Sequence, residues 1–240
     1  MKWYRTADRD LRLWYEKDEI EQIADDELRV ANLSPTTTAP VTDLERFIEG
    51  RLKADRDLYA ELPGDVLGLT EFDDDKRPRI CINAYLSTTA LEAERPAAGT
   101  VGRWRATLAH EASHVMLHRV LFVKDLAQDQ LFEAPDVRES FDPLMRCLKR
   151  DIGYGSGPGD WREVQANAGM AALLMPQRVF RRLALSEGAQ IVEAGAARDA
   201  ELSRRLSERC GVSRQAASIR LSTLGLAAAS SAAAMFVPVE

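Results

Sequence analysis

The sequence contains little cysteine, no excess of positive charge and no long hydrophobic run. Its three cysteines, Cys81, Cys147 and Cys210, are scattered and odd in number, which argues against a disulfide framework and fits reduced thiols. A formal net charge of -6 argues against a protein that coats nucleic acid or anionic membranes through bulk charge. No segment approaches the roughly 20 apolar residues of a membrane span, because the alanine-rich stretch at 226–238 is shorter and broken by serines.

The first ten residues, MKWYRTADRD, also lack the apolar core of a secretory signal. Together with the cysteine usage, this start predicts a cytoplasmic protein. The composition, with 45% hydrophobic and 29% charged residues, is that of an ordinary globular protein that can bury a core.

Histidine is equally scarce, and all three copies lie in the thirteen residues TLAHEASHVMLHR at 107–119. HEASH matches H-E-x-x-H, in which residues four apart on a helix lie on one face about 6 Å apart, so His110 and His114 can hold one cation. Glu111 lies roughly 100° round the helix from His110, where it could take a proton from water and pass it to a leaving amine. His118 has drifted further round the helix, and we expect it to support a ligand instead of ligating directly.

A helix that merely carries polar residues is the alternative interpretation. Its opposite face is apolar and would bury the helix, at Leu108, Ala112, Val115 and Met116. Burying imidazoles beside a carboxylate without a partner would be costly. The segment therefore predicts a metal site.

The third metal ligand must be a carboxylate or a cysteine, because no histidine is left. The candidates are Cys147, Asp160 and Glu163, besides more distant acids. Glu163 opens the predicted helix WREVQANAGMAALLM, which stops at Pro176. Asp160 followed three residues later by Glu163 is also a capping-box arrangement, which needs no metal. The residues alone leave ligation and capping evenly matched.

The other patterns predict a mixed fold. Helical spacing covers 18–33, 41–55 and 101–121, and short apolar runs at 65–72 and 79–86 on either side of DDDKRP predict a hairpin. If the run at 79–86 is an edge strand, its free backbone groups could align an extended substrate.

The composition of charged residues changes near residue 176. Residues 176–226 hold nine arginines, no lysine and five acids, a net charge of +4 in a chain of -6. We therefore expect a first domain at 1–175 and a second, helical one at 176–240 that ends in the alanine-rich tail.

The stretch AELSRRLSERCGVSRQAASIRL has a helix-turn-helix pattern. We expect one helix to about Arg209, a turn at Cys210 and Gly211, and Ser213 as the cap of a second helix. Four arginines could contact phosphates of nucleic acid or a partner: Arg204, Arg205, Arg214 and Arg220. A net +4 with five interleaved acids is modest for a DNA-reading module, so a structural or substrate-docking role is favoured over DNA binding.

The ordered trio TLAHEASHVMLH, EVQANAGMAALLMP and LSERCGVSRQAASIRLSTLGL resembles the ImmA/IrrE family of metallopeptidases over roughly residues 65–226. That family has a hairpin, a tLAHELgHxxLH helix, an ExxAN-x-FA-x-LLMP helix and a VS-x-x-A-x-x-RL-x-x-LGL segment. The resemblance implies an α+β, mainly helical, zincin-like metallopeptidase core with a small hairpin or sheet, followed by a helical, helix-turn-helix-like module. It also implies His110, His114 and Glu163 as ligands of one zinc ion, Glu111 as the base, and Asn167 in support.

Two departures from the family pattern bear on pocket shape and touch no implied ligand. Ser113 replaces the glycine before His114, and NAGMAALLMP lacks the usual aromatic residue after AN.

The resemblance further implies a substrate, because family members act on DNA-binding repressors of the phage type, whose cleavage derepresses mobile-element or stress genes. We therefore expect a zinc endopeptidase that cleaves a helix-turn-helix repressor. The alternative is a transcriptional regulator that binds DNA or a partner without proteolysis. Intact Glu111 favours the peptidase, because a purely structural zinc site needs no base.

Three other side chains are candidates near the site. Tyr85 and Tyr154 could each donate a hydroxyl to a developing oxyanion, and Tyr154 is preferred because it lies in the Gly-rich stretch GYGSGPGD at 153–160, just before Glu163. Cys147 could approach the metal as a thiolate, although an ordinary buried cysteine is the commoner case.

Overall fold

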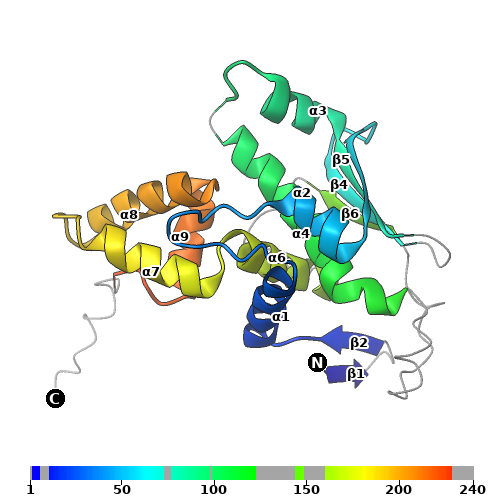
Figure 1. The fold of residues 1–240 in the computed structure, drawn as a ribbon, viewed down its shortest axis with the longest axis horizontal. Coiled ribbons are helices and arrows are strands. Elements are labelled where there is room, and N and C mark those ends of the chain that lie inside the picture. Colours follow the sequence, from blue (N-terminus) through cyan, green and yellow to red (C-terminus); the bar gives the residue numbers. More distant parts are fainter. Residues whose placement is uncertain are drawn as a thin grey trace, which may run out of the picture.

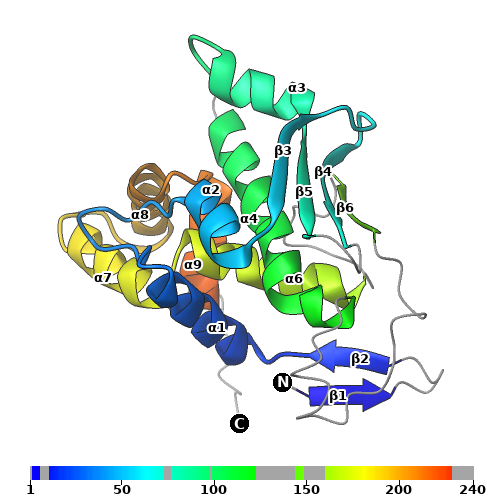
Figure 2. The same cartoon turned by 45° about the vertical axis from the view of Figure 1, so that its right-hand side comes forward.

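Helix α4 (Thr100–His118), which carries the three histidines, lies in the computed structural model between a β-sheet and the helices α1 (Lys17–Val30) and α6 (Trp161–Leu174) (Figures 1 and 2). The structure describes residues 2–5, 11–72, 77–97, 99–122, 144–148 and 160–228. Within these residues the protein is α+β, with more helix than strand, as predicted. Tyr154 and the side chain of Cys147 lie outside the described residues, so the predictions for both stay open.

The main sheet has the strand order β3-β5-β4-β6. Strands β4 (Val66–Glu71) and β5 (Arg79–Asn83) form the predicted antiparallel hairpin. Strand β3 (Asp55–Ala60) runs parallel to β5, and β6 (Leu144–Leu148) runs antiparallel to β4. Because β5 has a neighbour on each side, it is not the free edge strand that substrate alignment along it would require.

Strand β3 follows the helix predicted at 41–55, which the structure forms over residues 44–52. Helix α2 (Leu44–Phe47) continues as a π-helical turn (Ile48–Leu52), and Lys53 then takes a left-handed φ of 54° that ends it. The chain enters β3 at Asp55. This strand lies at a sheet edge with largely exposed or half-exposed, charged side chains, so it lacks the apolar pattern by which a strand is recognised.

Helices and one two-stranded ribbon supply the rest of the described fold, and the helices predicted at 18–33, 101–121 and 161–175 are confirmed. Within the described residues, the elements not yet bounded are β1 (Lys2–Arg5), β2 (Leu11–Trp14), α3 (Ala84–Ser87), its π-helical extension (Thr88–Glu92), a 3-10 turn (Arg119–Leu121), α7 (Gln177–Gly188), α8 (Gly195–Cys210) and α9 (Arg214–Thr223). Strands β1 and β2 pair antiparallel as a separate ribbon. None of the described helices is long and apolar enough to cross a bilayer.

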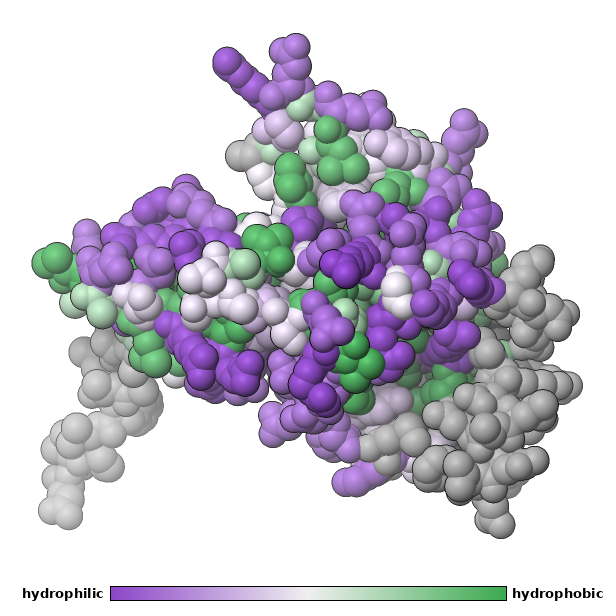
Figure 3. Space-filling view, viewed as in Figure 1, coloured by the Kyte–Doolittle hydropathy of each residue, from purple (hydrophilic) through white to green (hydrophobic). Residues whose placement is uncertain are grey.

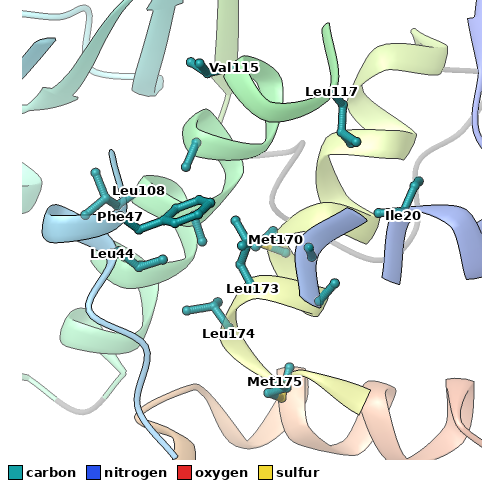
Figure 4. Packing of buried hydrophobic residues seen from close by; sticks show 14 of the residues in the cluster. Ile20, Leu44, Phe47, Leu108, Val115, Leu117, Met170, Leu173, Leu174 and Met175 are labelled. Atoms are coloured by element: carbon teal, nitrogen blue, oxygen red, sulfur yellow. The ribbon is translucent and has the colours of Figure 1, made fainter. Parts of the chain in front are cut away.

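Apolar side chains of α4, α6, α1 and α2 form the core around the histidine helix. Leu108 faces Phe47 and Leu44, while Met170 and Leu173 of α6 lie close by (Figure 4). The same hydrophobic cluster continues into α7, α8 and α9 through residues such as Phe180, Leu206 and Leu221. The helices after residue 176 thus share the core of the preceding segment, and a domain boundary there remains a prediction.

The C-terminal helices lie where the sequence predicts them. Helix α8 ends at Cys210, Gly211 takes a left-handed φ of 64°, and the Ser213 side chain accepts a hydrogen bond from the Ala216 amide at the start of α9. Hydrophilic side chains dominate the surface over α7 and α8 in Figure 3, with apolar residues in small separate patches. The helix positions agree with the prediction, and a DNA-binding role for them stays untested.

Arg220 does not have the exposed position that contact with phosphates requires. Its side chain is only 3% exposed, and its guanidinium donates to the Glu21 carboxylate and to the Met175 carbonyl. The prediction of a nucleic-acid or partner contact at Arg220 is therefore wrong, because burial against α1 and the end of α6 occupies the group. Arg214 is exposed, whereas Arg204 and Arg205 form ion pairs with Glu201.

The two departures from the family pattern contact one another between α4 and α6. Gly169 stands at the position of the missing aromatic residue, and a Cβ atom there would lie 2.7 Å from Ser113 Oγ and 2.8 Å from Ser113 Cβ. The Ser113 hydroxyl donates to the Ala109 carbonyl on its own helix. Ser113 on α4 is larger than the glycine of the family pattern, and Gly169 on α6 is smaller than the aromatic residue of that pattern. The two changes offset each other, and the helices pack closely.

Gly169→Ala is therefore expected to lower the free energy of unfolding by about 1–3 kcal/mol through overpacking. Helix propensity alone predicts the opposite sign, because alanine is favoured over glycine by about 1 kcal/mol in a helix. Urea denaturation decides between them, and Ser113→Gly should restore the stability of the alanine variant. A stabilising Gly169→Ala substitution would contradict the close contact.

Candidate metal centre

His110, His114 and Glu163 converge from two helices on one point. The two histidines lie one turn apart on α4 and are fully buried, while Glu163 lies in the first turn of α6 and is largely buried. His110 Nε2 lies 3.1 Å from His114 Nε2 and 3.0 Å from Glu163 Oε2. His114 Nε2 lies 3.3 Å from Glu163 Oε1. Among the described residues, these three form a group whose ligand atoms could hold a metal ion.

The spacing and chemistry of this donor set fit zinc. With zinc–nitrogen distances of 2.0–2.1 Å, ligand atoms at the corners of a tetrahedron lie about 3.4 Å apart, close to the separations between these three side chains. Two unprotonated Nε2 atoms facing each other repel, and a shared cation removes that repulsion. Two imidazoles and one carboxylate are also the donor set of catalytic zinc sites, which keep a fourth position for water or substrate.

Asn167 holds His110 in the orientation that ligation needs. Its Oδ1 lies 3.2 Å from His110 Nδ1, and an amide oxygen can only accept, so Nδ1 carries the proton. The lone pair is then on Nε2, the atom that faces Glu163. Asn167 therefore lies where the predicted supporting role requires it.

Asp160 and Glu163 have separate roles, which the sequence left open. The Asp160 side chain accepts from the Arg162 amide and caps α6. The Glu163 carboxylate is not used in a capping box and contacts both histidines instead. Capping and contact with the histidines thus coexist on one helix turn, and Asp160 is not part of the described group that could hold a metal ion.

Glu111 is fully buried between α4 and strand β4. Its Oε2 accepts a 2.6 Å hydrogen bond from the Thr70 hydroxyl, and its Oε1 has no hydrogen-bond partner among the described residues. Gly68 and Thr70 are two apart on β4 and so face the same side of the sheet. A Cβ atom at Gly68 would lie 2.6 Å from Glu111 Oε1, so glycine is what lets the strand lie against the carboxylate.

The buried setting shifts the pKa values of this cluster. Desolvation raises the pKa of Glu111 to about 8, against the opposing effects of His110 and Thr70. Burial alone would raise the pKa of Glu163, but its close contacts with the two histidines outweigh burial and lower that pKa far below its usual range. Burial lowers the pKa of His114. The cluster therefore contains two carboxylates with opposite behaviour, one favouring a proton and one held ionised.

His118 does not point at the metal group. Its Nδ1 lies 3.1 Å from His114 Nδ1, its Nε2 lies 3.2 Å from Gln165 Oε1, and its ring meets Trp161 edge to face. Burial keeps its pKa well below the usual value, so the ring is neutral. His118 thus contacts a candidate ligand without joining the group, in agreement with the expectation from helix geometry.

Three residues of this site were not singled out from the sequence: Gly68, Thr70 and Gln165. A glycine inside the apolar strand VLGLTE is a known sign of close backbone approach, and it could have indicated the contact with Glu111. Gln165 is an uncharged polar residue between Glu163 and Asn167, in a helix whose later residues are apolar. Neither signal identifies the partner, which comes from another segment of the chain.

Comparison with known proteins adds one match. Residues 153–222 match the family model described as the IrrE N-terminal-like domain. No curated protein matches the chain. The matched segment contains Glu163 and Asn167 and the helices α7, α8 and α9, but not the histidine helix. This match, beside the geometry of the centre, supports the assignment of the chain to the ImmA/IrrE family of metallopeptidases.

Proposed function

We propose that this protein is a zinc-dependent endopeptidase in which His110, His114 and Glu163 hold one zinc ion and Glu111 is the general base. The observation that carries the proposal is the convergence of three ligand atoms beside a buried carboxylate with one unpartnered oxygen among the described residues. A structural metal site would close its coordination with a fourth residue and would have no use for such a base.

The division of work follows from the positions of the side chains. A bound zinc ion would supply Lewis acidity toward water and the scissile carbonyl. Glu111 would accept a proton from the attacking water and deliver it to the leaving amine. Thr70 holds Oε2 of Glu111, which leaves Oε1 for the water. The raised pKa of Glu111 suits a group that must both take and return a proton near neutral pH.

Glu111→Gln tests the proposal directly. The purified wild-type protein should contain one zinc ion per chain by mass spectrometry, and the variant should retain it, because Glu111 is not a ligand. Cleavage should fall by about 10²–10⁴-fold, since glutamine cannot act as a base. Glu61→Gln, at an exposed position, is the matched control. Undiminished cleavage by Glu111→Gln would remove Glu111 as the base.

Gly68→Ala should impair the proposed base, Glu111, without disturbing the proposed zinc ligands. The added methyl group would overlap Glu111 Oε1 and would also lie 2.8 Å from Thr107 Cγ2, so the carboxylate must move. A displacement of about 1 Å can cost 10²-fold in rate, and we expect a loss of that order with zinc content unchanged. Gly64→Ala, where a Cβ atom meets nothing within 4 Å, should have no effect. Loss of zinc from the Gly68→Ala variant would contradict the assignment of Glu111 as a base that does not bind the metal.

As substrate we propose a DNA-binding repressor of the helix-turn-helix type, whose cleavage would derepress mobile-element or stress genes. The support is the resemblance of the three motifs to the ImmA/IrrE family. Incubation of the enzyme with the repressor encoded beside its own gene, followed by intact-mass analysis, would show a single cut. We place this activity in the cytoplasm, where buried free thiols such as Cys81 and Cys210 stay reduced.

The alternative, a regulator that binds DNA without proteolysis, receives less support. Arg220 is buried, and Arg204 and Arg205 already form ion pairs with acids of α8. A gel shift on the DNA upstream of the gene, abolished by Arg214→Ala, would favour that alternative.

A further inference from the structure

A line of buried polar groups leads from the candidate metal ligand His114 to the N-terminal segment. His114 Nδ1 lies 3.1 Å from His118 Nδ1, and His118 Nε2 lies 3.2 Å from Gln165 Oε1. Gln165 Nε2 donates a 3.0 Å hydrogen bond to the carbonyl of Leu13 in β2. All four residues are at most 1% exposed, so solvent does not compete for these groups.

The protons in this line can be arranged in one consistent way. The Leu13 carbonyl can only accept, so it fixes the amide nitrogen of Gln165 on its side and turns the amide oxygen toward His118. His118 must then carry its proton on Nε2, which leaves a lone pair on Nδ1. His114 consequently donates from Nδ1, and its own lone pair is on Nε2, the atom that faces Glu163 and His110.

We propose that Gln165 is a positioning residue of the metal centre, which fixes the tautomer of His118 and through it the orientation and tautomer of His114. This inference rests on the proposed zinc-binding function of His114. Helix α6 then orients all three imidazoles of the chain. Its Glu163 meets the two Nε2 atoms, its Asn167 holds His110, and its Gln165 holds His118.

The N-terminal segment contributes the fixed end of this line. Leu13 is fully buried, and two residues later the Tyr15 hydroxyl donates to the Leu117 carbonyl at the end of α4. The N-terminal segment therefore contacts both helices: Leu13 contacts Gln165 on α6, and Tyr15 contacts the turn of α4 that carries His118. The backbone carbonyl of Leu13 is held in place by the chain. It therefore fixes the side-chain amide of Gln165, whose oxygen and nitrogen could otherwise exchange places by rotation.

Zinc affinity gives the first test. Gln165→Met keeps the volume and removes both the acceptor and the donor. We expect its zinc dissociation constant, measured by competition with a chromophoric chelator, to rise by about 10-fold, the low end of the effect of removing a direct partner of a metal-bound histidine, because Gln165 acts on His114 through His118. Thr42→Val is the matched control, because it removes another buried hydrogen bond, from Thr42 to the Leu173 carbonyl on α6, that does not lead to a histidine. The zinc affinity of Thr42→Val should stay unchanged. The inference would be overturned if Gln165→Met kept its zinc affinity, or if both variants lost affinity equally.

The second test observes the tautomers themselves. Because the chain has only three histidines, the imidazole nitrogens are resolvable by nitrogen–proton correlation NMR of the zinc-loaded protein. We expect His118 protonated on Nε2 and His114 on Nδ1 in the wild type, and a second His118 tautomer in Gln165→Met. A proton on His118 Nδ1 in the wild type would overturn the proposal.

Substitution of His118 distinguishes positioning from packing. His118→Asn can still accept from His114 Nδ1 and should retain most of the zinc affinity, whereas His118→Leu should lose it as Gln165→Met does. Equal affinities in the two variants would refute the role of His118 as acceptor. Failure of the wild type to bind zinc would instead refute the proposed function, so the two outcomes are distinguishable.

Discussion

Replacing Glu163 by alanine should abolish tight zinc binding while leaving the fold intact. A catalytic zinc site has three protein ligands, and the carboxylate is the one that supplies negative charge next to two neutral imidazoles. We expect the affinity for zinc to fall by more than the roughly 100-fold that is lost when a residue hydrogen-bonded to a metal ligand is removed. Zinc at 1,000 times its dissociation constant stabilises a protein by about 4 kcal/mol. Chelation should therefore destabilise the wild type in a denaturation experiment, and it should leave the Glu163→Ala variant unchanged.

The neighbouring acid offers the matched control for this experiment. Asp160 caps α6 and does not face the histidines, so Asp160→Ala should cost about 1 kcal/mol of stability with zinc content retained. If Glu163→Ala keeps its zinc, or Asp160→Ala loses it, the ligand assignment is wrong.

Arg220→Met should produce the largest loss of stability among the substitutions away from the centre. Arg220 donates to Glu21 of α1 and, at 2.8 Å, to the carbonyl of Met175 at the end of α6. Removing one partner of a buried ion pair costs about 3–5 kcal/mol, because the other charge stays buried without compensation. In a chain of this size that loss corresponds to a fall of about 6–20 °C in the unfolding midpoint, measured by calorimetry.

A double substitution and an exposed pair provide the controls. Arg220→Met combined with Glu21→Met removes both charges and should cost much less than the sum of the single changes. Arg204→Met, which breaks solvent-exposed pairs with Glu201 and Glu208, should leave the unfolding midpoint nearly unchanged. Equal effects for Arg220 and Arg204 would show that burial of the first pair is energetically unimportant.

The Arg220 contacts also explain why the sequence alone suggested Arg220 as a possible contact for nucleic acid or a partner. In the sequence, Arg220 is one of several arginines in a segment of net charge +4, and nothing local distinguishes it from Arg214. Its partners lie 199 and 45 residues away along the chain. Only the packing of α9 against α1 and α6 buries one arginine and leaves the other in solvent.

The sequence by itself determined the parts of this protein that depend on local periodicity. The four-residue spacing of His110 and His114, the place of Glu111 between them, and the course of the helices follow from helix geometry and need no distant partner. The hairpin of β4 and β5 is local in the same sense. Strand β3 was missed because its edge position permits a charged, patternless sequence.

The tertiary structure decided everything that depends on which segments meet. The Asp160–Glu163 pair was equally compatible with capping and with ligation until α6 was seen to place Glu163 against both histidines. Thr70 and Gly68 acquire a role only because β4 lies against Glu111, and Gln165 only because Leu13 anchors it. These roles arise from contacts between residues 41 to 152 positions apart, and such contacts are fixed by the packing of the whole core and not by any local pattern.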